Sequence, residues 1–364
     1  MPAGDHGPEP GSRGPSRSRS ARAGTTAPAW AGSSAWRRRG ARLGRLGLGL
    51  LGLGLALAAG CAHGGAAGTR LQVLWVAPPG GPHAVATHLG LPLRTGQLVL
   101  SEAPGPYRLL FGLGTRHFWR FTHSALLVLQ DGEPYVYDFA GEYKPVFARS
   151  PAAGIRGGLR KTPLWDYVRA HLYVEIVDPA LLPGRRQLDA ARVSQRLRAI
   201  ERARVPFDAA WDLTDHRAYF CTEFLAEVLG PAGAAIPALD ALTDNPSLRR
   251  VLHWYGVRSA RTLPAGAFYA AERRVAAFSV WSGLAEVEAY FAAKAELHRR
   301  FTPAHRVGDV FRLVGHDLAV RAPIEEFLAA ARARFAGSPG APDGAAITRV
   351  VAALAHERFG AEGL

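Results

Sequence analysis

Cysteine is scarce in this sequence: the 364 residues contain two, Cys61 and Cys221. Two cysteines cannot build the disulfide framework on which small exported domains depend. The H-E-x-x-H pattern of zinc proteases is missing, since His298 and His305 do not have that spacing. No internal repeat is present, and the excess of arginine forms no basic stripe interleaved with aromatic residues. These absences argue against a disulfide scaffold, a zinc protease of that type and a nucleic-acid partner.

The apolar run at residues 46–60 has about 15 residues, fewer than the roughly 20 that a membrane span needs. It follows a basic cluster at residues 37–45 and precedes Cys61, in the order typical of a secretory signal. The segment Leu57-Ala58-Ala59-Gly60-Cys61 resembles the lipobox of bacterial lipoproteins, which implies that Cys61 carries a lipid. An ordinary signal peptide or an uncleaved anchor is the alternative.

From these segments we expect a signal peptide with a disordered leader over residues 1–60, and a lipid anchor with its tether over residues 61–89. Ala62 after the lipid-bearing cysteine resembles the signal for outer-membrane sorting. The resemblance implies an exported lipoprotein, attached to the membrane through Cys61 on the periplasmic face of the outer membrane. Cys221 then has no disulfide partner, and an unpaired cysteine in an exported protein indicates a reactive thiol.

We expect no cofactor and no metal. Residues 47–52 match the dinucleotide fingerprint G-x-G-x-x-G, but no strand precedes them and no βαβ unit surrounds them. Asp212, Asp215 and His216 form a small polar cluster whose spacing matches no familiar metal site. Solvation of a loop explains this cluster better than metal binding does.

Cys221 lies in the first turn of a predicted helix of about ten residues, which ends at Gly230-Pro231. The partial positive charge at a helix N-terminus favours a thiolate over a thiol. Cys221 also shares an apolar stripe with Phe224 and Val228, so the alternative is a buried core cysteine.

Two strand-like runs flank Asp131-Gly132, a strong signal for a β-hairpin. With a two-residue turn, positions whose numbers sum to 263 lie opposite each other, and His123 and Asp138 become diagonal neighbours on one face. A carboxylate that orients an imidazole is the third member of a Cys–His nucleophile system. The alternative is that both side chains are solvated at the ends of their strands.

The remaining pattern alternates short strands and helices before residue 231 and is mostly helical after it. We expect strands at residues 71–76, 96–100 and 172–177, and helices at residues 164–168, 187–204, 247–255, 284–300, 323–335 and 345–359.

Three features occur together: a histidine that begins a strand, a hairpin that returns to an acidic residue, and the later segment Tyr219-Phe220-Cys221-Thr222-Glu223. This combination resembles the circularly permuted branch of the NlpC-type papain-like amidases, the YaeF/YiiX-like group, in which the His precedes the Cys. The resemblance covers roughly residues 90–270. It departs from the family pattern at Phe207, Phe220 and Thr222, where Tyr, Tyr and Ser are usual.

The resemblance implies an α+β protein with a circularly permuted papain-like fold, in which an antiparallel sheet packs on the nucleophile helix. The catalytic domain is expected at residues 90–283, with a C-terminal helical extension at residues 284–364. The implied roles are Cys221 as nucleophile, His123 as base and Asp138 as orienting acid. Tyr219 is expected to line the substrate side of the pocket.

The function that these features imply is hydrolysis of an amide bond in a peptide, in peptidoglycan or in a lipid, through an acyl-enzyme on Cys221. One alternative is a lipid acyltransferase, although a second histidine and an N-C-E-H context are missing. The other alternative is a non-catalytic envelope lipoprotein whose papain-like lobe binds or scaffolds.

Overall fold

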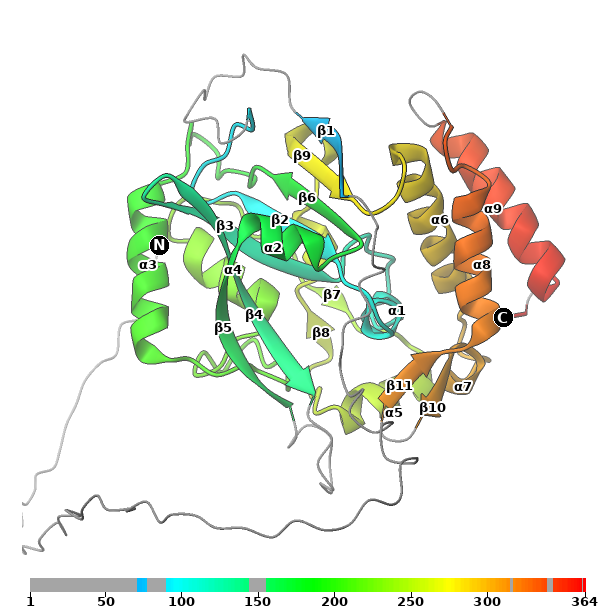
Figure 1. Cartoon of the computed structure of the whole chain (residues 1–364). Coiled ribbons are helices and arrows are strands. Elements are labelled where there is room, and N and C mark those ends of the chain that lie inside the picture. The colour runs from blue at the N-terminus through cyan, green and yellow to red at the C-terminus, as the bar shows by residue number, and fades with distance from the viewer. Residues whose placement is uncertain (1–70, 77–89, 144–154, 315–316, 339–342, 362) are drawn as a thin grey trace, which may run out of the picture. The chain divides into compact units, whose positions relative to one another are not determined.

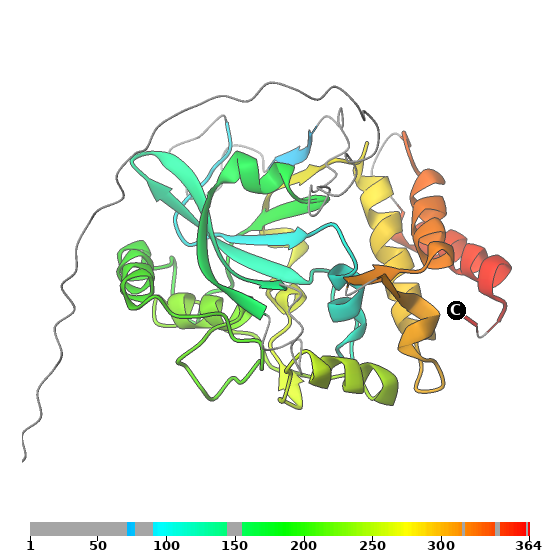
Figure 2. The ribbon, with the colours of Figure 1, turned by 60° about the horizontal axis from the view of Figure 1, so that its bottom comes forward.

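The computed structural model of the chain describes residues 71–76, 90–143, 155–314, 317–338, 343–361 and 363–364 (Figure 1). These residues form an α+β protein with one large antiparallel sheet (Figure 2). Its strands, in spatial order, are β1 (Gln72–Val76), β9 (Arg274–Ser279), β6 (Tyr173–Val177), β2 (Leu98–Glu102), β3 (His123–Gln130), β4 (Glu133–Tyr143) and β5 (Ile155–Pro163). Two small ribbons pair β7 (Asp240–Ala241) with β8 (Arg261–Thr262) and β10 (Phe311–Val314) with β11 (Asp317–Val320).

The hairpin of β3 and β4 has the register that the sequence predicts. Asp131 and Gly132 both have positive φ, 51° and 84°, as a tight two-residue hairpin turn requires. The pairs run from Gln130 opposite Glu133 to Leu126 opposite Tyr137, so the numbers of each pair sum to the predicted value. The register prediction is confirmed.

Nine α-helices lie within the described ranges: α1 (Tyr107–Leu113), α2 (Leu164–Arg169), α3 (Ala190–Ala203), α4 (Cys221–Leu229), α5 (Pro246–Trp254), α6 (Leu284–Arg300), α7 (Val307–Val310), α8 (Ala322–Ala333) and α9 (Gly344–Phe359). Short 3-10 helices occur at Ala265–Phe268 and Ala271–Arg273. The helices expected from the sequence all form, with ends that differ by a few residues.

The sheet has an apolar core on each face. On one face, Leu98, Leu126 and Tyr137 pack with residues of α3, α4 and α6. On the other face, Val99, Leu127 and neighbouring strand residues pack against α2. Strands that are buried on both faces have continuous apolar runs. Residues 125–128 of β3 are such a run, because alternate side chains enter the two cores in turn.

The end of α4 differs from the common pattern. Glycine after a helix commonly takes the left-handed conformation, but Gly230 has φ of −55° and ψ of −55° and stays right-handed. A Cβ at this position would come within 2.9 Å of the Ala226 carbonyl oxygen. Glycine is favoured here because the backbone is close, not because the residue is left-handed. Pro231, which has no backbone N–H, then ends the helix.

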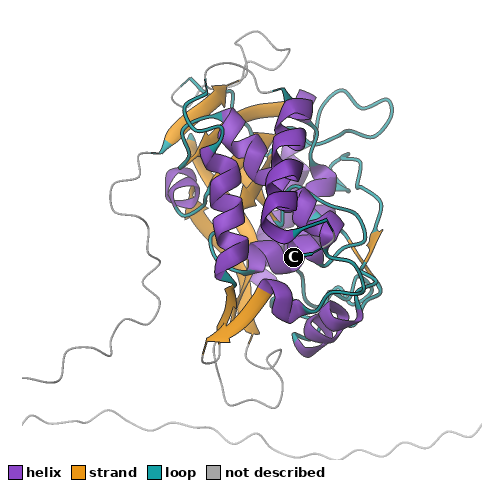
Figure 3. Ribbon diagram, turned by 90° about the vertical axis from the view of Figure 1, so that its right-hand side faces the viewer, coloured by secondary structure: helices purple, strands orange, loops and turns teal. Residues whose placement is uncertain are grey.

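The C-terminal helices α6, α8 and α9 pack on one another, and α6 also contacts α1 (Figures 1 and 3). Their apolar residues Phe291, Phe327 and Val351 belong to the same core as the strand and α4 residues on that face of the sheet. At the opposite end of the chain, β1 pairs with β9, so residues 72–76 within the expected tether add an edge strand to the sheet.

The leader, the apolar run at residues 46–60 and Cys61 lie outside the described residues. Within the described ranges, none of the helices has both the length and the apolar character required to cross a bilayer.

Candidate active site

Cys221 is the first residue of α4, directly after Phe220, whose extended backbone starts the helix. It is the free cysteine of the described chain and is partly exposed. Thr222 secures the same turn, because its hydroxyl donates to the Leu263 carbonyl at 2.7 Å. The sulfur therefore lies at the positive end of a short helix whose first turn is hydrogen-bonded to Leu263, far along the chain.

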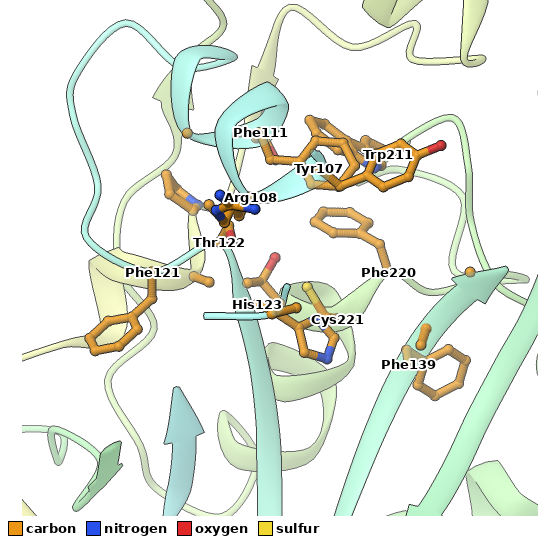
Figure 4. A pocket seen from close by; sticks show the side chains of 18 of the residues that line it. Tyr107, Arg108, Phe111, Phe121, Thr122, His123, Phe139, Trp211, Phe220 and Cys221 are labelled. Atoms are coloured by element: carbon orange, nitrogen blue, oxygen red, sulfur yellow. The ribbon is translucent and has the colours of Figure 1, made fainter. Parts of the chain in front are cut away.

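His123 begins β3 and contacts both remaining members of the predicted triad. Its Nε2 lies 2.8 Å from Oδ2 of Asp138, and its imidazole lies close enough to Cys221 to lower the pKa of the thiol. Because Asp138 occupies Nε2, Nδ1 is the ring nitrogen left for the sulfur. Figure 4 shows His123 and Cys221 next to each other at the base of the site. The structure thus brings together the three residues that the sequence singled out.

The electrostatics of the pair favour charge separation. Burial acts to lower the pKa of His123, but hydrogen bonds to Asp138 and Cys221 outweigh it and raise this pKa to about 10. Burial likewise acts to raise the pKa of the Cys221 thiol, but the hydrogen bond and the charge of His123, together with Ser124, bring it below its ordinary value. A thiolate beside an imidazolium is the reactive form of such a pair.

Arg160 on β5 is a member of the site that sequence reasoning missed. It pairs directly across the sheet with Asp138, and its Nε and Nη2 donate to the two carboxylate oxygens at 3.2 and 2.7 Å. Asp138 is fully buried, which acts to raise its pKa, yet the hydrogen bonds and charges of His123 and Arg160 hold the pKa at about 2. The acid is therefore ionised and fixed in orientation.

Beside the sulfur lies a cavity of about 320 Å³ (Figure 4). Most of its wall is apolar or aromatic, and the aromatic side chains come from four segments that are distant in the sequence. They include Tyr107 and Phe111 of α1, Phe139 of β4, Trp211, Phe220 and Tyr255. Sequence reasoning missed them, since no local pattern shows that these segments meet.

Tyr219 does not line this cavity. Its side chain is 4% exposed, and its ring packs edge-on against Phe139 with the centroids 5.6 Å apart. The extended backbone before α4 sends consecutive side chains to opposite sides, so Phe220 lies at the cavity and Tyr219 lies in the core. The side chain that faces the cavity is that of Phe220, one position after the predicted Tyr219.

The polar cluster near residue 212 does not converge on one point. Asp212 accepts hydrogen bonds from Thr214, Asp215 pairs with Arg217, and His216 Nδ1 lies 3.1 Å from Oε1 of Glu223. Across the described ranges, no group of three or more His, Cys, Asp or Glu side chains is placed to hold a metal ion. Glu223 is 3% exposed, and burial raises its pKa to about 8.

Comparison with known proteins adds little. No family model matches the chain, and no curated protein matches it. Among solved structures, a weak neighbour is a chain described as metalloprotein yiiX from Escherichia coli O157:H7. The two chains are 14% identical with a TM-score of 0.38, over 50% of this chain and 95% of the other. No residue of the site is assigned from that likeness.

Proposed function

We propose that the protein is a cysteine hydrolase of the cell envelope that cleaves an amide bond, on a circularly permuted papain-like fold. One observation carries the proposal: a partly exposed cysteine at a helix N-terminus contacts a histidine, which contacts a buried, ionised aspartate. In this proposal residues 90–283 form the catalytic domain and residues 284–364 form a helical extension. The order His123 before Cys221 is the order of the permuted branch.

The chemistry proceeds in two balanced steps. The Cys221 thiolate attacks the carbonyl carbon, the C–N bond breaks, and the amine leaves with a proton from His123, so that a thioester remains. His123 then takes a proton from water, the resulting hydroxide attacks the thioester, and the acid leaves while the thiolate and the imidazolium return. Asp138 stays ionised throughout and orients the imidazole.

The carbonyl oxygen becomes negatively charged in each step and needs hydrogen-bond donors to stabilise it. The backbone N–H of Cys221 belongs to the first turn of α4, where N–H groups have no partner within the helix. We assign this group as one oxyanion donor. In other hydrolases one such donor contributes about 3–4 kcal/mol to the transition state.

The cavity wall favours an apolar group next to the scissile bond. Trp211, Phe220 and Phe111 form an aromatic surface within the cavity that contains the sulfur. Such a surface suits the chain of a lipid amide or an apolar side chain of a peptide better than the sugars of peptidoglycan. Peptidoglycan peptides remain among the substrates to be compared.

Labelling with a thiol electrophile tests the proposal. An iodoacetamide–alkyne probe is expected to label folded protein in a Cys61→Ser background at neutral pH, and to lose the signal in Cys221→Ala. Hydrolysis of N-acyl amides by the same protein, abolished by Cys221→Ala and by His123→Ala, completes the test. A folded protein that neither reacts with the probe nor cleaves amides would be the non-catalytic binding lobe.

We also propose that the chain is an exported lipoprotein, attached through Cys61 on the periplasmic face of the outer membrane. Support comes from the lipobox-like segment and from Ala62 after the cysteine. Cells that express the chain are expected to incorporate labelled palmitate into it, and Cys61→Ser is expected to abolish that incorporation. Palmitate incorporation by Cys61→Ser to the wild-type level would refute lipidation at this residue.

A further inference from the structure

The guanidinium of Arg160 has one nitrogen without a hydrogen-bond partner among the described residues. Nε and Nη2 donate to Asp138, whereas no hydrogen bond or ion pair to Nη1 occurs within the described ranges. The side chain is 47% exposed, although the aspartate that it binds is fully buried. Arg160 also lines the cavity beside Cys221. Its outer edge is therefore a charged donor at the cavity wall, next to the catalytic residues.

Arg108 lines the same cavity and makes a useful contrast. All three of its guanidinium nitrogens are engaged: Nε with the Tyr290 hydroxyl, Nη1 with the Gly105 carbonyl and Nη2 with Glu325. Its side chain is 9% exposed. Arg108 thus holds α1 against α6 and α8. Of these two arginines, Arg160 is the one with a guanidinium nitrogen that has no partner among the described residues.

Among the other titratable groups of the wall, His123 is charged but is already engaged with Asp138 and Cys221. No Asp or Glu occurs among the described residues that line the cavity. His171 lines it as well, but burial lowers its pKa to about 4, so its ring is neutral, and Nδ1 lies 2.6 Å from the Tyr167 carbonyl. With Nδ1–H donating to that carbonyl, Nε2 is an acceptor and cannot bind an anion. The Cys221 thiolate is the like charge that an anionic group meets on the described wall, and the His123 imidazolium beside it offsets that charge.

We propose that Arg160 binds an anionic group of the substrate, a carboxylate or a phosphate, while the aromatic side of the cavity holds an apolar group. The inference rests on the proposed hydrolase and names its substrate class: an anionic amphiphile whose amide bond lies between the two parts. Arg160 is then a specificity residue through Nη1 and a positioning residue for Asp138 through Nε and Nη2. Guanidinium is suited to both tasks because its donors are fixed in one plane.

Binding to a protein that cannot turn over separates this inference from catalysis. Three probes share a decanoyl chain and an amide: N-decanoylglycine carries a carboxylate, N-decanoylphosphoethanolamine a phosphate, and N-decanoylglycinamide no charge. Titration calorimetry on full-length Cys221→Ala is expected to show at least one anionic probe binding about tenfold or more tighter than the neutral probe. The tighter of the two anions identifies the group that the site selects.

Two variants in the same background complete the test. Arg160→Gln is expected to reduce the affinity for the anionic probe to that for the neutral one, with the neutral affinity unchanged. Arg156→Gln removes an exposed arginine of the same strand that does not line the cavity, and is expected to change neither affinity. Thermal unfolding of each variant establishes that it is folded.

Three results would overturn the inference: equal affinity for the neutral and anionic probes, equal weakening of both by Arg160→Gln, or no binding of any probe. Equal weakening would mean that Arg160 acts only through Asp138. If the wild-type protein binds the anionic probes more tightly but hydrolyses none of the probes, the proposed hydrolysis of these amides is refuted. The proposed anion site is then still supported. The failures of the two proposals are therefore distinct.

Discussion

Nε2 of His123 lies 2.8 Å from Oδ2 of Asp138, across two neighbouring strands whose register is set by the turn at Asp131-Gly132. The contact holds the imidazole in one orientation and favours its charged form. The charge on His123 in turn favours the thiolate of Cys221. The reactivity of the sulfur thus depends on a carboxylate that it does not touch.

Asp138→Asn is the variant that tests this dependence. Loss of the carboxylate charge lowers the pKa of His123 from about 10 and thereby raises the pKa of Cys221. The rate of alkylation by iodoacetamide at pH 7 is expected to fall about ten- to a hundredfold, and its pH midpoint is expected to move upward. The measurement is the alkylation rate from pH 4 to 10 in a Cys61→Ser background. Overlapping wild-type and Asp138→Asn profiles would show that the aspartate does not act on the thiol.

Asp138 also makes the free energy of unfolding depend on pH in the acidic range. Its pKa is about 2 in the folded protein, against an ordinary value of 3.8. A carboxyl group with a depressed pKa adds stability that is present above pH 3.8 and is lost as the pH falls through about 2. The expected loss is about 2 kcal/mol, measured as the free energy of unfolding in urea at pH 6 and pH 2.5.

Asp138→Asn is expected to lose less stability than the wild type over the same interval, because the amide does not titrate. Asp166→Asn is the matched control, since Asp166 is 58% exposed and pairs with Arg169 on the surface. Its acid dependence is expected to match that of the wild type. Equal slopes for Asp138→Asn and the wild type would contradict the depressed pKa.

Glu223 has the opposite effect. Glu223 is buried on α4, two residues after Cys221, and its Oε2 has no partner in the described part of the chain. Burial and the charge of Asp208 raise its pKa to about 8. The unfolded chain ionises this group near pH 4.5, so the folded state loses stability as the pH rises from 4.5 to 8. The glutamine side chain in Glu223→Gln has nearly the same shape as glutamate and does not titrate.

The Tm of Glu223→Gln is therefore expected to equal that of the wild type near pH 4 and to exceed it at pH 8, by about 2–4 °C for each kcal/mol gained. The measurement is thermal unfolding at both pH values. Glu227→Gln, four residues later on the same helix and paired with Arg196, is the control and is expected to show no such rise. A lower Tm for Glu223→Gln at pH 8 would mean that the carboxylate is stabilising.

Local patterns predict the pairing of His123 with Asp138 and the helix that begins at Cys221, whereas the meeting of His123 with Cys221 is expected only from the family resemblance. The Asp131-Gly132 turn determines the pairing of its two strands, so the relation between His123 and Asp138 follows by counting residues. The helix that begins at Cys221 follows from its apolar spacing and from Gly230-Pro231. Both inferences depend on interactions between residues that are close in the sequence.

Arg160 could not be predicted in the same way. Strand β5 contains Gly157 and Gly158 side by side and shows no apolar alternation, so its arginines read as solvated. The close approach of two strands explains the glycines, since a Cβ on Gly157 would come within 2.0 Å of the Ala140 carbonyl oxygen. The aromatic cavity and the pairing of β1 with β9 likewise depend on contacts between distant segments.

A buried ion pair joins the sheet to the C-terminal helices. Nζ of Lys294 on α6 lies 2.7 Å from Oε1 of Glu102 at the end of β2, and both side chains are at most 1% exposed. The Tyr290 hydroxyl donates to the same carboxylate oxygen and accepts from Arg108, which binds Glu325 on α8. Glu102 is therefore one point at which the C-terminal helices are bonded to the sheet.

Lys294→Met leaves the carboxylate of Glu102 buried without its cation and is expected to cost about 3–5 kcal/mol in the free energy of unfolding. Glu102→Gln combined with Lys294→Met removes both charges, keeps an acceptor for Tyr290, and is expected to recover at least half of that loss. Urea unfolding of the two single variants and the double variant measures the coupling between the residues. Additive losses would mean that the two side chains contribute separately and that the ion pair does not couple the sheet to α6.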